Sequence, residues 1–597
     1  MKVKTLLRST FAKKTVLQTL LIGLLFVPTI LLAQTTGGKV SGTLPVVYIN
    51  TDGAVDVTVK DKDISATAYI DALGLDGYKN MASALKPDTL LVKGHGNYTF
   101  RAYNKKPFRL KFSKKVQPLG MKKSKQFLLL AAADDAHGAL TNLTGYELSR
   151  RLGLAWTPGA VPVELVFNGD YRGLYFLTEK IKVEKNRVNI VEQNDKETDP
   201  EKVKGGWLVE IDNYNTDPHI DVNMGGKTMW VTYHTPEELS TVQKEYLQSQ
   251  WDSIASSLYV DDPKDQEWEK HIDMESLAKV YLCRELLQDE EGFHGSCYLY
   301  KDLTDTKWYF GPVWDFGNGF SGNTHKYIFK DPEFSNWIID RAWTFDAFRL
   351  KVKELWHSFY YGGFATMDEW FDTTAATLSQ AVVSDYNRWK GEQPASGGSK
   401  VQVTNDEQAK ANECKAFIHD KASWLEDQWF PQTGDSVNIY VYTDKSSDVP
   451  YLYWWGGKST APSWPGVKMT ETCIVGDSLF YTKRLPKGVS IIFSLVADGE
   501  TNAASAAQKT QTEDIKNVER DSWYYFYQNP GSLSGYKDGR YEDITYSMNR
   551  RLATSVIMPV RTLHRRTDAM YNLSGQRVTG PYKGIVIVKG QKKIVTR

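Results

Sequence analysis

The chain has 597 residues and carries 73 Lys and Arg side chains against 72 Asp and Glu, for a formal net charge of +1. Because these charges balance, the composition provides no global attraction to nucleic acid or to an anionic membrane surface, and we expect no nucleic-acid partner. At about 150 residues per domain, the length excludes a single small fold and predicts two to four folded units.

The first 33 residues have the features of a signal peptide. Five basic side chains occur among the first 14 residues, and an apolar run over residues 20–32 ends just before Gln34. Gly23 and Pro28 interrupt this run, which is too short for a membrane span of about 20 residues. We therefore expect an exported protein, secreted, at the cell surface or periplasmic, that begins near Gln34 and has no transmembrane span after cleavage.

The four cysteines are Cys283, Cys297, Cys414 and Cys473. Their spacing matches neither a zinc site nor a dense disulfide framework. Free, buried thiols are the simpler interpretation, and a Cys283–Cys297 disulfide is the alternative in an oxidising compartment.

Patterning along the chain predicts separate segments. Strand patterns dominate residues 46–211 and helical periodicity dominates residues 239–430, which predicts one mixed unit. Short alternating segments with Gly and Pro punctuation then predict a β-sandwich. The expected segments are the mixed unit at 34–432, the β-sandwich at 433–530, a Gly-, Ser- and Arg-rich linker at 531–567 and a β tail at 568–597. The expected fold class is α+β.

A cationic stretch follows the first predicted strands. Ten basic residues and no acidic one lie between residues 101 and 133. They are Arg101, Lys105, Lys106, Arg109, Lys111, Lys114, Lys115, Lys122, Lys123 and Lys125. Alternation over residues 105–112 predicts a strand with Phe108, Leu110 and Phe112 toward the core and with Arg109 and Lys111 on the opposite face. Two cations on one face suit phosphate oxygens, and the alternative is an ordinary solvated face.

Two features near this stretch bear on phosphate binding. The glycines of residues 93–97 allow backbone N–H groups to approach an anion closely. Further on, Asn168 and Gly169 separate two predicted strands and are typical of a type I′ hairpin. Glu179 ends the second strand, where it is suited to orient a phosphate-binding lysine as in kinases or to form a surface ion pair.

The later part of the mixed unit supplies carboxylates at the ends of predicted elements. Helices are expected at residues 140–152 and 277–287, and strands at 298–300 and 308–310. Asp315 follows in an Asp-Phe-Gly tripeptide, where a carboxylate can hold the divalent cation that phosphoryl transfer requires. The tripeptide alone is a weak signal.

The order of these segments is more specific than any one of them. They lie at residues 105–112, 134–135, 162–165, 173–179, 206–212 and 311–316. Together they resemble the spore-coat CotH kinase family over residues 46–430. The resemblance implies an atypical protein-kinase-like domain that uses ATP with Mg²⁺ or Mn²⁺ to phosphorylate Ser or Thr of protein substrates.

The resemblance also implies roles for individual residues. Lys111 and Arg109, with Lys106 and Glu179, would form the nucleotide site, and Asp315 would bind the metal. Where the family has a catalytic Asp followed two residues later by Asn, this chain has Glu291 and Phe293, and Asp289 is the substitute carboxylate. The longer Glu side chain moves its carboxylate by about an ångström, which can cost ~100-fold in rate. The alternative is therefore a catalytically silent scaffold that acts as a surface glycan (starch)-binding protein.

The predicted β-sandwich is rich in aromatic residues. Tyr451, Tyr453 and Trp455 share one face of a predicted strand, and Trp464 follows in a Trp-Pro-Gly turn. Such rings stack on sugars or fill a core. Residues 436–528 resemble the family 26 starch-binding module.

This second resemblance implies binding of starch or another α-glucan, with Tyr453, Trp455 and Trp464 as stacking residues and Gln511 as a hydrogen-bonding residue. The segment between Phe493 and Gln511 is longer than the corresponding turn of that family.

The last thirty residues look like the short C-terminal β element of secreted Bacteroidetes proteins, which implies sorting or surface attachment. An ordinary β-hairpin is the alternative. A glycoside hydrolase has little support, because no pair of carboxyl groups can be assigned the separation of about 5–9.5 Å that such enzymes need.

Overall fold

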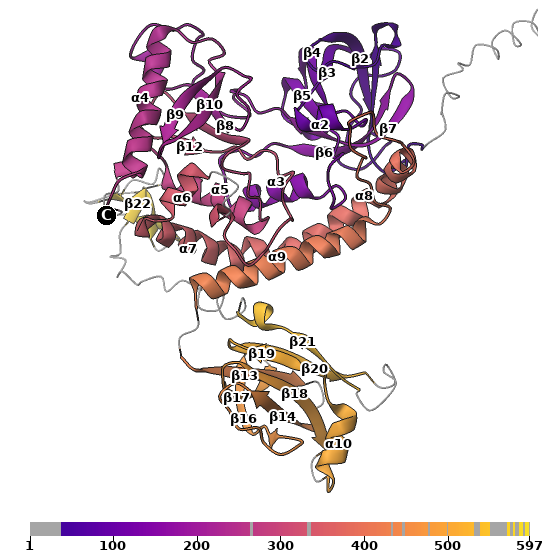
Figure 1. Cartoon of the computed structure of the whole chain (residues 1–597), viewed down its shortest axis with the longest axis vertical. Coiled ribbons are helices and arrows are strands. Elements are labelled where there is room, and N and C mark those ends of the chain that lie inside the picture. The colour runs from indigo at the N-terminus through magenta and orange to yellow at the C-terminus, as the bar shows by residue number, and fades with distance from the viewer. Residues whose placement is uncertain are drawn as a thin grey trace, which may run out of the picture. The chain divides into compact units, whose positions relative to one another are not determined.

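The computed structural model describes residues 38–262, 267–330, 336–431, 434–443, 448–475, 478–497, 500–529 and 538–549, and short strands between residues 570 and 595. The predicted signal peptide at residues 1–33 lies outside the described residues. The chain divides into two compact units, Met1–Phe430 and Pro431–Arg597 (Figure 1).

The first unit begins with a closed barrel. Its strands are β1 (Val46–Thr51), β2 (Ile64–Asp71), β3 (Asp88–Gly94), β4 (Phe108–Val116), β5 (Ser124–Leu130), β6 (Ala160–Phe167) and β7 (Asp170–Glu179). They are ordered β1-β2-β3-β4-β5-β7-β6, and a parallel pairing of β1 with β6 closes the barrel. A closed barrel leaves no free sheet edge, so each strand satisfies its backbone hydrogen bonds on both sides.

The local expectations for the barrel are confirmed. In β4, Phe108, Leu110 and Phe112 are buried in the barrel core, whereas Arg109 and Lys111 lie on the outer face. The turn between β6 and β7 places Asn168 at φ 52° and Gly169 at φ 79°, the positive values that a type I′ turn requires.

The rest of the first unit combines a five-stranded antiparallel sheet with helices. The sheet, ordered β12-β11-β8-β10-β9, consists of β8 (Trp207–Asp212), β9 (His219–Met224), β10 (Lys227–Thr235), β11 (Cys297–Lys301) and β12 (Tyr309–Phe310). The helices are α2 (Tyr98–Ala102), α3 (Thr141–Arg151), α4 (Thr241–Leu258), α5 (Met274–Leu286), α6 (Trp337–Ala342), α7 (Asp346–Tyr361), α8 (Met367–Trp389) and α9 (Glu407–Trp429). The expected helices at residues 140–152 and 277–287 correspond to α3 and α5.

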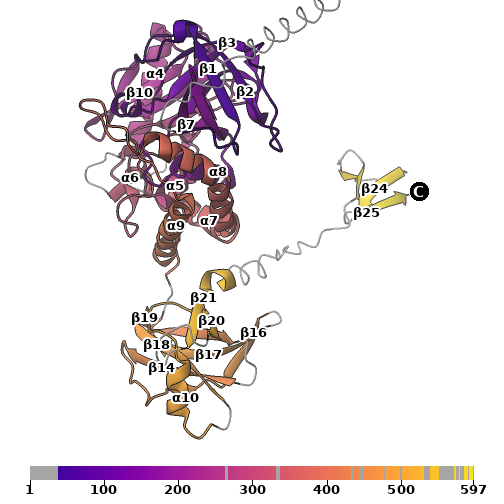
Figure 2. The ribbon, with the colours of Figure 1, turned by 90° about the vertical axis from the view of Figure 1, so that its right-hand side faces the viewer.

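Helix α8 packs against barrel strand β7, as Figure 2 shows. Lys105 enters this contact just before β4 and pairs with Asp385 of α8 at 2.8 Å, with the lysine side chain 1% exposed. Asp385 also accepts a hydrogen bond from the backbone N–H of Leu174 in β7 at 2.9 Å. A buried carboxylate with these partners attaches the helix to two barrel segments at once.

Two sheets enclose one core in the second unit. The first, ordered β16-β17-β13-β20-β21, comprises β13 (Ser436–Thr443), β16 (Glu471–Val475), β17 (Ser478–Pro486), β20 (Ser522–Gln528) and β21 (Gly539–Asp543). The second, ordered β15-β14-β18-β19, comprises β14 (Asp448–Gly456), β15 (Val467–Lys468), β18 (Val489–Ala497) and β19 (Ile515–Val518). Side chains of both sheets, such as Val441, Leu452 and Phe493, form a single buried cluster.

The second unit differs from the expectation at two places. Helix α10 (Ala503–Thr510) occupies the long segment between Phe493 and Gln511. Strand β21 lies inside the expected linker and pairs with β20. Tyr524 lies opposite Asp543 at one end of this pairing and Gln528 lies opposite Gly539 at the other, so the folded module continues to residue 543. The sequence signal was weak there because β21 is a short edge strand with little apolar alternation.

The C-terminal residues contain strands β22 (Met570–Asn572), β23 (Arg577–Val578), β24 (Gly584–Val588) and β25 (Gln591–Val595), ordered β23-β22-β24-β25. In the described part of the chain, no helix combines the length and apolar character needed to span a membrane. Cys283, Cys297, Cys414 and Cys473 are free thiols, the first three buried, so the Cys283–Cys297 disulfide is not formed.

Candidate functional site

A cationic surface lies on the outside of the barrel where three strands end or pair. Lys93 of β3 is the cross-strand partner of Arg109 of β4, and Lys180 directly follows β7. Burial, together with the positive charge of Arg109, lowers the pKa of Lys180 to about 8. The Nε–H group of Arg109 is buried and has no hydrogen-bond partner among the described residues. Crowded cations with unused donors favour an anionic ligand.

His95 directly follows β3 and lies within this cationic surface. Burial lowers its pKa to about 3, and the positive charges of Lys180, Lys60, Arg109 and Lys93 act in the same direction. The imidazole is therefore neutral near pH 7 and can exchange a hydrogen bond with a ligand without adding charge.

A cluster of carboxylates is assembled from three loops. Asp134 follows β5, Asp289 and Glu291 follow α5, and Asp315 follows β12. Burial, together with the charges of Asp315 and Asp289, raises the pKa of Glu291 to about 7. Burial also raises the pKa of Asp134, and the charge of Asp315 adds to this effect. These mutual effects show that the carboxylates lie close enough to repel one another.

Arg284 of α5 holds the loops that carry this cluster. Its guanidinium pairs with Asp289 and donates to the backbone carbonyls of Asp315 and Trp314, the last two at 2.5 Å. It also lies over the ring of Phe316 at 4.2 Å from the centroid. With Arg284 only 1% exposed, these contacts fix the position of Asp315, which adopts a positive φ of 51°.

The cationic and acidic groups meet at one place. The rings of His95 and Trp314 are in edge contact with centroids 6.5 Å apart, and Trp314 precedes Asp315. Thr99 of α2 donates to the Asp134 carboxylate at 3.0 Å. The loop after β3 therefore connects the phosphate-type surface of the barrel with the carboxylates of the other half of the unit.

The donor set fits a divalent cation bound together with a ligand. Among the described residues, no three His, Cys, Asp or Glu side chains converge closely enough to hold a metal ion by themselves. The charge of Asp315 nevertheless raises the pKa of both Asp134 and Glu291, and a cation would neutralise negative charge at this place. Carboxylate oxygens that share a cation with phosphate oxygens are typical of Mg²⁺ sites.

The residues proposed for nucleotide binding are not all in this place. Lys111 is exposed on the outer face of β4. The ammonium group of Lys106 donates a hydrogen bond to the backbone carbonyl of Phe100 at 2.5 Å. Glu179 is buried and accepts from the backbone N–H groups of Gly159 and Lys122 at 3.0 and 3.3 Å. Glu179 therefore accepts hydrogen bonds from the local backbone, and it forms no ion pair with a lysine among the residues that the structure describes.

Several site residues were not singled out from the sequence. His95 lies within the glycine-containing segment 93–97, Asp134 lies within the motif at 134–135, and Lys180 directly follows Glu179. Arg284 lies in α5, a helix that is buried over most of its length, and a basic residue within such an apolar segment is the signal that could have identified it.

The aromatic residues of the second unit form a surface group. The ring of Tyr453 lies 5.8 Å from that of Trp455 and 5.4 Å from that of Trp464, and all three residues are half-buried. The indole N–H of Trp464 donates to the backbone carbonyl of Ala504 in α10 at 3.1 Å. Helix α10 therefore orients Trp464, a contact that spacing in the sequence did not reveal.

Gln511 does not share this exposure. It caps the C-terminal end of α10 and is 9% exposed, so its side chain offers little surface to a glycan. Helix α10 occupies the segment that precedes Gln511, and the spacing in the sequence did not predict this helix.

Comparison with known proteins gives one family match and two partial structural similarities. No curated protein matches the chain. Two solution structures from a beta/alpha-amylase of Paenibacillus polymyxa are similar in part. The module CBM25-2 is 19% identical and CBM25-1 is 16% identical; each comparison covers 19% of this chain and 95% of the other, with a TM-score of 0.13. The family model described as CotH kinase protein matches residues 92–425, more than half of the chain. The chain therefore belongs to the CotH kinase family.

Proposed function

We propose that the chain is an exported CotH-type atypical kinase that transfers the γ-phosphate of ATP to Ser or Thr of a protein substrate, with an appended α-glucan-binding module. The observation that carries the proposal is the meeting of a cationic barrel surface, around Arg109 and Lys180, with the carboxylates around Asp315. Nucleotide phosphates need the first and a divalent cation needs the second. Membership of the CotH family supports the use of a nucleotide and a divalent metal.

The side chains have distinct roles in the proposed transfer. Lys93, Arg109 and Lys180 bind phosphate oxygens, and Asp315 with Asp134 would hold the Mg²⁺ or Mn²⁺, which neutralises phosphate charge when bound. Glu291, with a pKa of about 7, accepts the proton of the substrate Ser or Thr hydroxyl while the oxygen of that hydroxyl bonds to the γ-phosphorus. The bond from the γ-phosphorus to the bridging oxygen breaks, and ADP leaves with its electron pair.

The test is incubation of the purified mature chain with labelled ATP and Mg²⁺ or Mn²⁺, beside Asp315→Ala and Glu291→Gln. We expect label on the chain or on a generic acceptor, reduced at least ~100-fold in both variants, since each removes a group that acts in the transition state. Activity should be lost at low pH, where Glu291 is protonated, so the rate should rise as the pH increases through about 7. Label that persists in Asp315→Ala would contradict the assignment.

A second candidate is a catalytically silent scaffold that binds surface glycans. One observation favours it: the side-chain amides of Asn213 and Asn318 each donate to a different oxygen of Glu291. A carboxylate that already accepts two hydrogen bonds is a weaker base. Absence of both label and nucleotide binding would support this candidate.

The glycan-binding part of the proposal rests on the ring group of Tyr453, Trp455 and Trp464. We expect Trp464→Ala to weaken retention of the mature chain on insoluble starch by about fivefold or more, because one stacking surface is lost. Tyr527→Ala, a half-buried ring on the other sheet, is the matched control and should leave retention unchanged. Equal retention of Trp464→Ala and the control would contradict the site.

Export and surface attachment complete the proposal. The basic and apolar start of the chain supports cleavage near Gln34, and the C-terminal β element supports sorting. N-terminal sequencing of the protein from the culture medium and from the cell envelope tests both, because an uncleaved intracellular chain would contradict them.

A further inference from the structure

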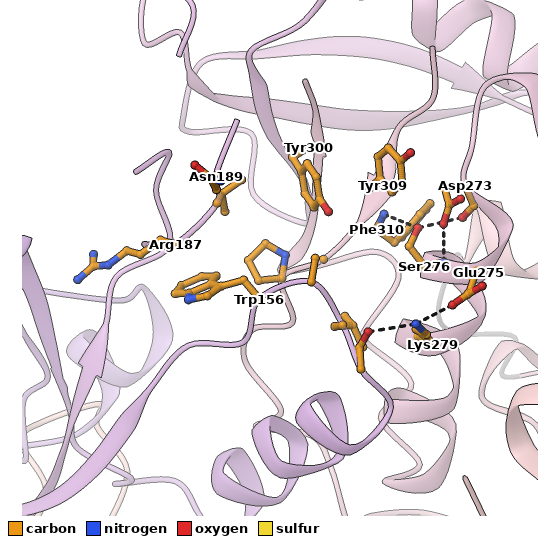
Figure 3. A pocket seen from close by; sticks show the side chains of 16 residues that line it. Trp156, Arg187, Asn189, Asp273, Glu275, Ser276, Lys279, Tyr300, Tyr309 and Phe310 are labelled. Carbon is orange, nitrogen blue, oxygen red and sulfur yellow. Dashed lines mark hydrogen bonds and ion pairs between the residues drawn. The ribbon is translucent and has the colours of Figure 1, made fainter. Parts of the chain in front are cut away.

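A cavity in the first unit is lined by none of the cationic and acidic residues described above. It has a volume of about 570 Å³ and is bordered by the segment after α3, the segment after β7, the start of α5 and the strands β11 and β12 (Figure 3). This size falls within the range of small-molecule sites, about 300–1,000 Å³.

Aromatic rings form part of its wall. Tyr300 and Tyr309 stack on each other with centroids 5.5 Å apart and ring planes 13° apart. Trp156 lines the cavity from the segment after α3, as Figure 3 shows. Trp156 and Tyr300 also pack on the apolar cluster around Leu208, which supports both rings from behind. The cavity thus offers flat apolar surfaces that are held in place.

Polar groups beside these rings remain available. Within the described part of the chain, no hydrogen bond is made by the hydroxyl groups of Tyr300 and Tyr309 or by the side-chain amide of Asn189. Asp273 accepts the N–H of Ser276 through Oδ1 at 2.8 Å and so caps α5, and Glu275 pairs with Lys279 at 2.7 Å. Donors and acceptors are therefore both present at the rim.

The charges of the cavity cancel and its cations are engaged. Two basic residues, Arg187 and Lys279, are balanced by Asp273 and Glu275. The Arg187 guanidinium donates to the carbonyls of Lys180 and Gln126 at 2.7 and 2.8 Å. Lys279 donates to the carbonyl of Gly153 at 3.0 Å as well as pairing with Glu275. No cation of the wall is left for a phosphate, which disfavours a nucleotide here.

We propose that this cavity binds a neutral saccharide of one or two rings. Flat aromatic surfaces suit the C–H face of a sugar ring, and the hydroxyl groups of Tyr300 and Tyr309 with the amide of Asn189 suit its hydroxyls. The site lies in the first unit and involves none of the aromatic residues of the second unit. Saccharide binding in this cavity can therefore be tested independently of the proposed starch site and of kinase activity.

The experiment is saturation-transfer difference NMR on the full mature chain that carries Trp455→Ala and Trp464→Ala, so that binding by the second unit is reduced. The probes are maltose, cellobiose, lactose and diacetylchitobiose, with glucuronic acid and glucose 6-phosphate as charged counterparts. We expect signal from at least one neutral disaccharide and a weaker response from the charged sugars. Titration of that disaccharide then gives its Kd.

Variants assign the signal to the cavity. Tyr309→Ala should raise the Kd about fivefold or more through loss of a stacking ring. Asn189→Ala, at an exposed position where misfolding is not expected, should raise it at least about threefold through loss of hydrogen bonds. Lys185→Ala, exposed on the same connecting segment but outside the cavity wall, should leave it unchanged. No signal from any neutral disaccharide, tighter binding of a charged sugar, or an unchanged Kd in Asn189→Ala would each overturn the proposal.

Discussion

Glu407 is a carboxyl group that the fold keeps away from water. It is the first residue of α9, is 2% exposed, and accepts the backbone N–H of Ala139 at 3.0 Å through Oε1. Its Oε2 atom has no partner in the described residues. Burial, together with the charges of Asp135 and Asp385, raises the pKa of Glu407 to about 8. The group is therefore protonated in the folded chain near pH 7.

This raised pKa makes stability depend on pH. The unfolded chain releases the proton near pH 4.5 and the folded chain near pH 8, so the folded state binds more protons between these values and stability falls as pH rises through that window. In Glu407→Gln this loss is absent. Between pH 5.5 and pH 9 we expect the unfolding free energy of the variant, relative to the original chain, to improve by about 2–3 kcal/mol. Chemical denaturation at both pH values measures it, and a constant difference would show that Glu407 ionises normally.

Among the elements, the contact of α8 with the barrel depends on one buried ion pair. Asp385 pairs with Lys105 and accepts from Leu174, and it lies directly against Gly173 of β7. A Cβ atom at Gly173 would lie 1.9 Å from Oδ1 of Asp385, and Gly173 has a φ of 96°. The glycine that opens the motif at residues 173–179 is therefore required by the approach of α8.

Removal of this pair should be costly. Asp385→Ala leaves the ammonium group of Lys105 buried without a counter-charge and one backbone N–H without an acceptor, so we expect the first unit to lose about 3–5 kcal/mol. Glu392→Ala is the control, since its pair with Arg388 is partly exposed and is worth about 1 kcal/mol or less. Denaturant midpoints of both variants measure the difference, and similar losses in the two would contradict the role of the buried pair.

At the scale of the whole molecule, the two units have separate cores. The barrel cluster of the first unit includes Phe127 and Leu129, and the cluster of the second includes Ile439 and Phe526. Separate hydrophobic cores predict that the two units can unfold independently.

Calorimetry of the mature chain should therefore show two transitions. ATP with Mg²⁺ at about 100 times its Kd should stabilise the first unit alone by about 2.7 kcal/mol. Trp464→Ala should leave this shift unchanged, whereas Asp315→Ala should reduce it. A single concerted transition, or a shift in the second unit only, would contradict the assignment of nucleotide binding.

The sequence by itself determined the features that depend on neighbouring residues. The alternation around Arg109, the Asn168-Gly169 turn and the helices at α3 and α5 follow from local periodicity and backbone preference, and the structure confirms each. The order of short motifs was also sufficient to indicate the CotH family, whose model matches residues 92–425.

Only the tertiary structure decided which side chains meet. His95, Asp134 and Asp315 come from loops far apart in the chain, and their proximity depends on how the barrel packs on the other half of the unit. Glu179 accepts backbone hydrogen bonds within the first unit. In the second unit, Gln511 is buried at the end of α10, a helix that the sequence did not predict. Local sequence fixes backbone preference, whereas the distance between remote side chains depends on long-range burial, which no short segment encodes.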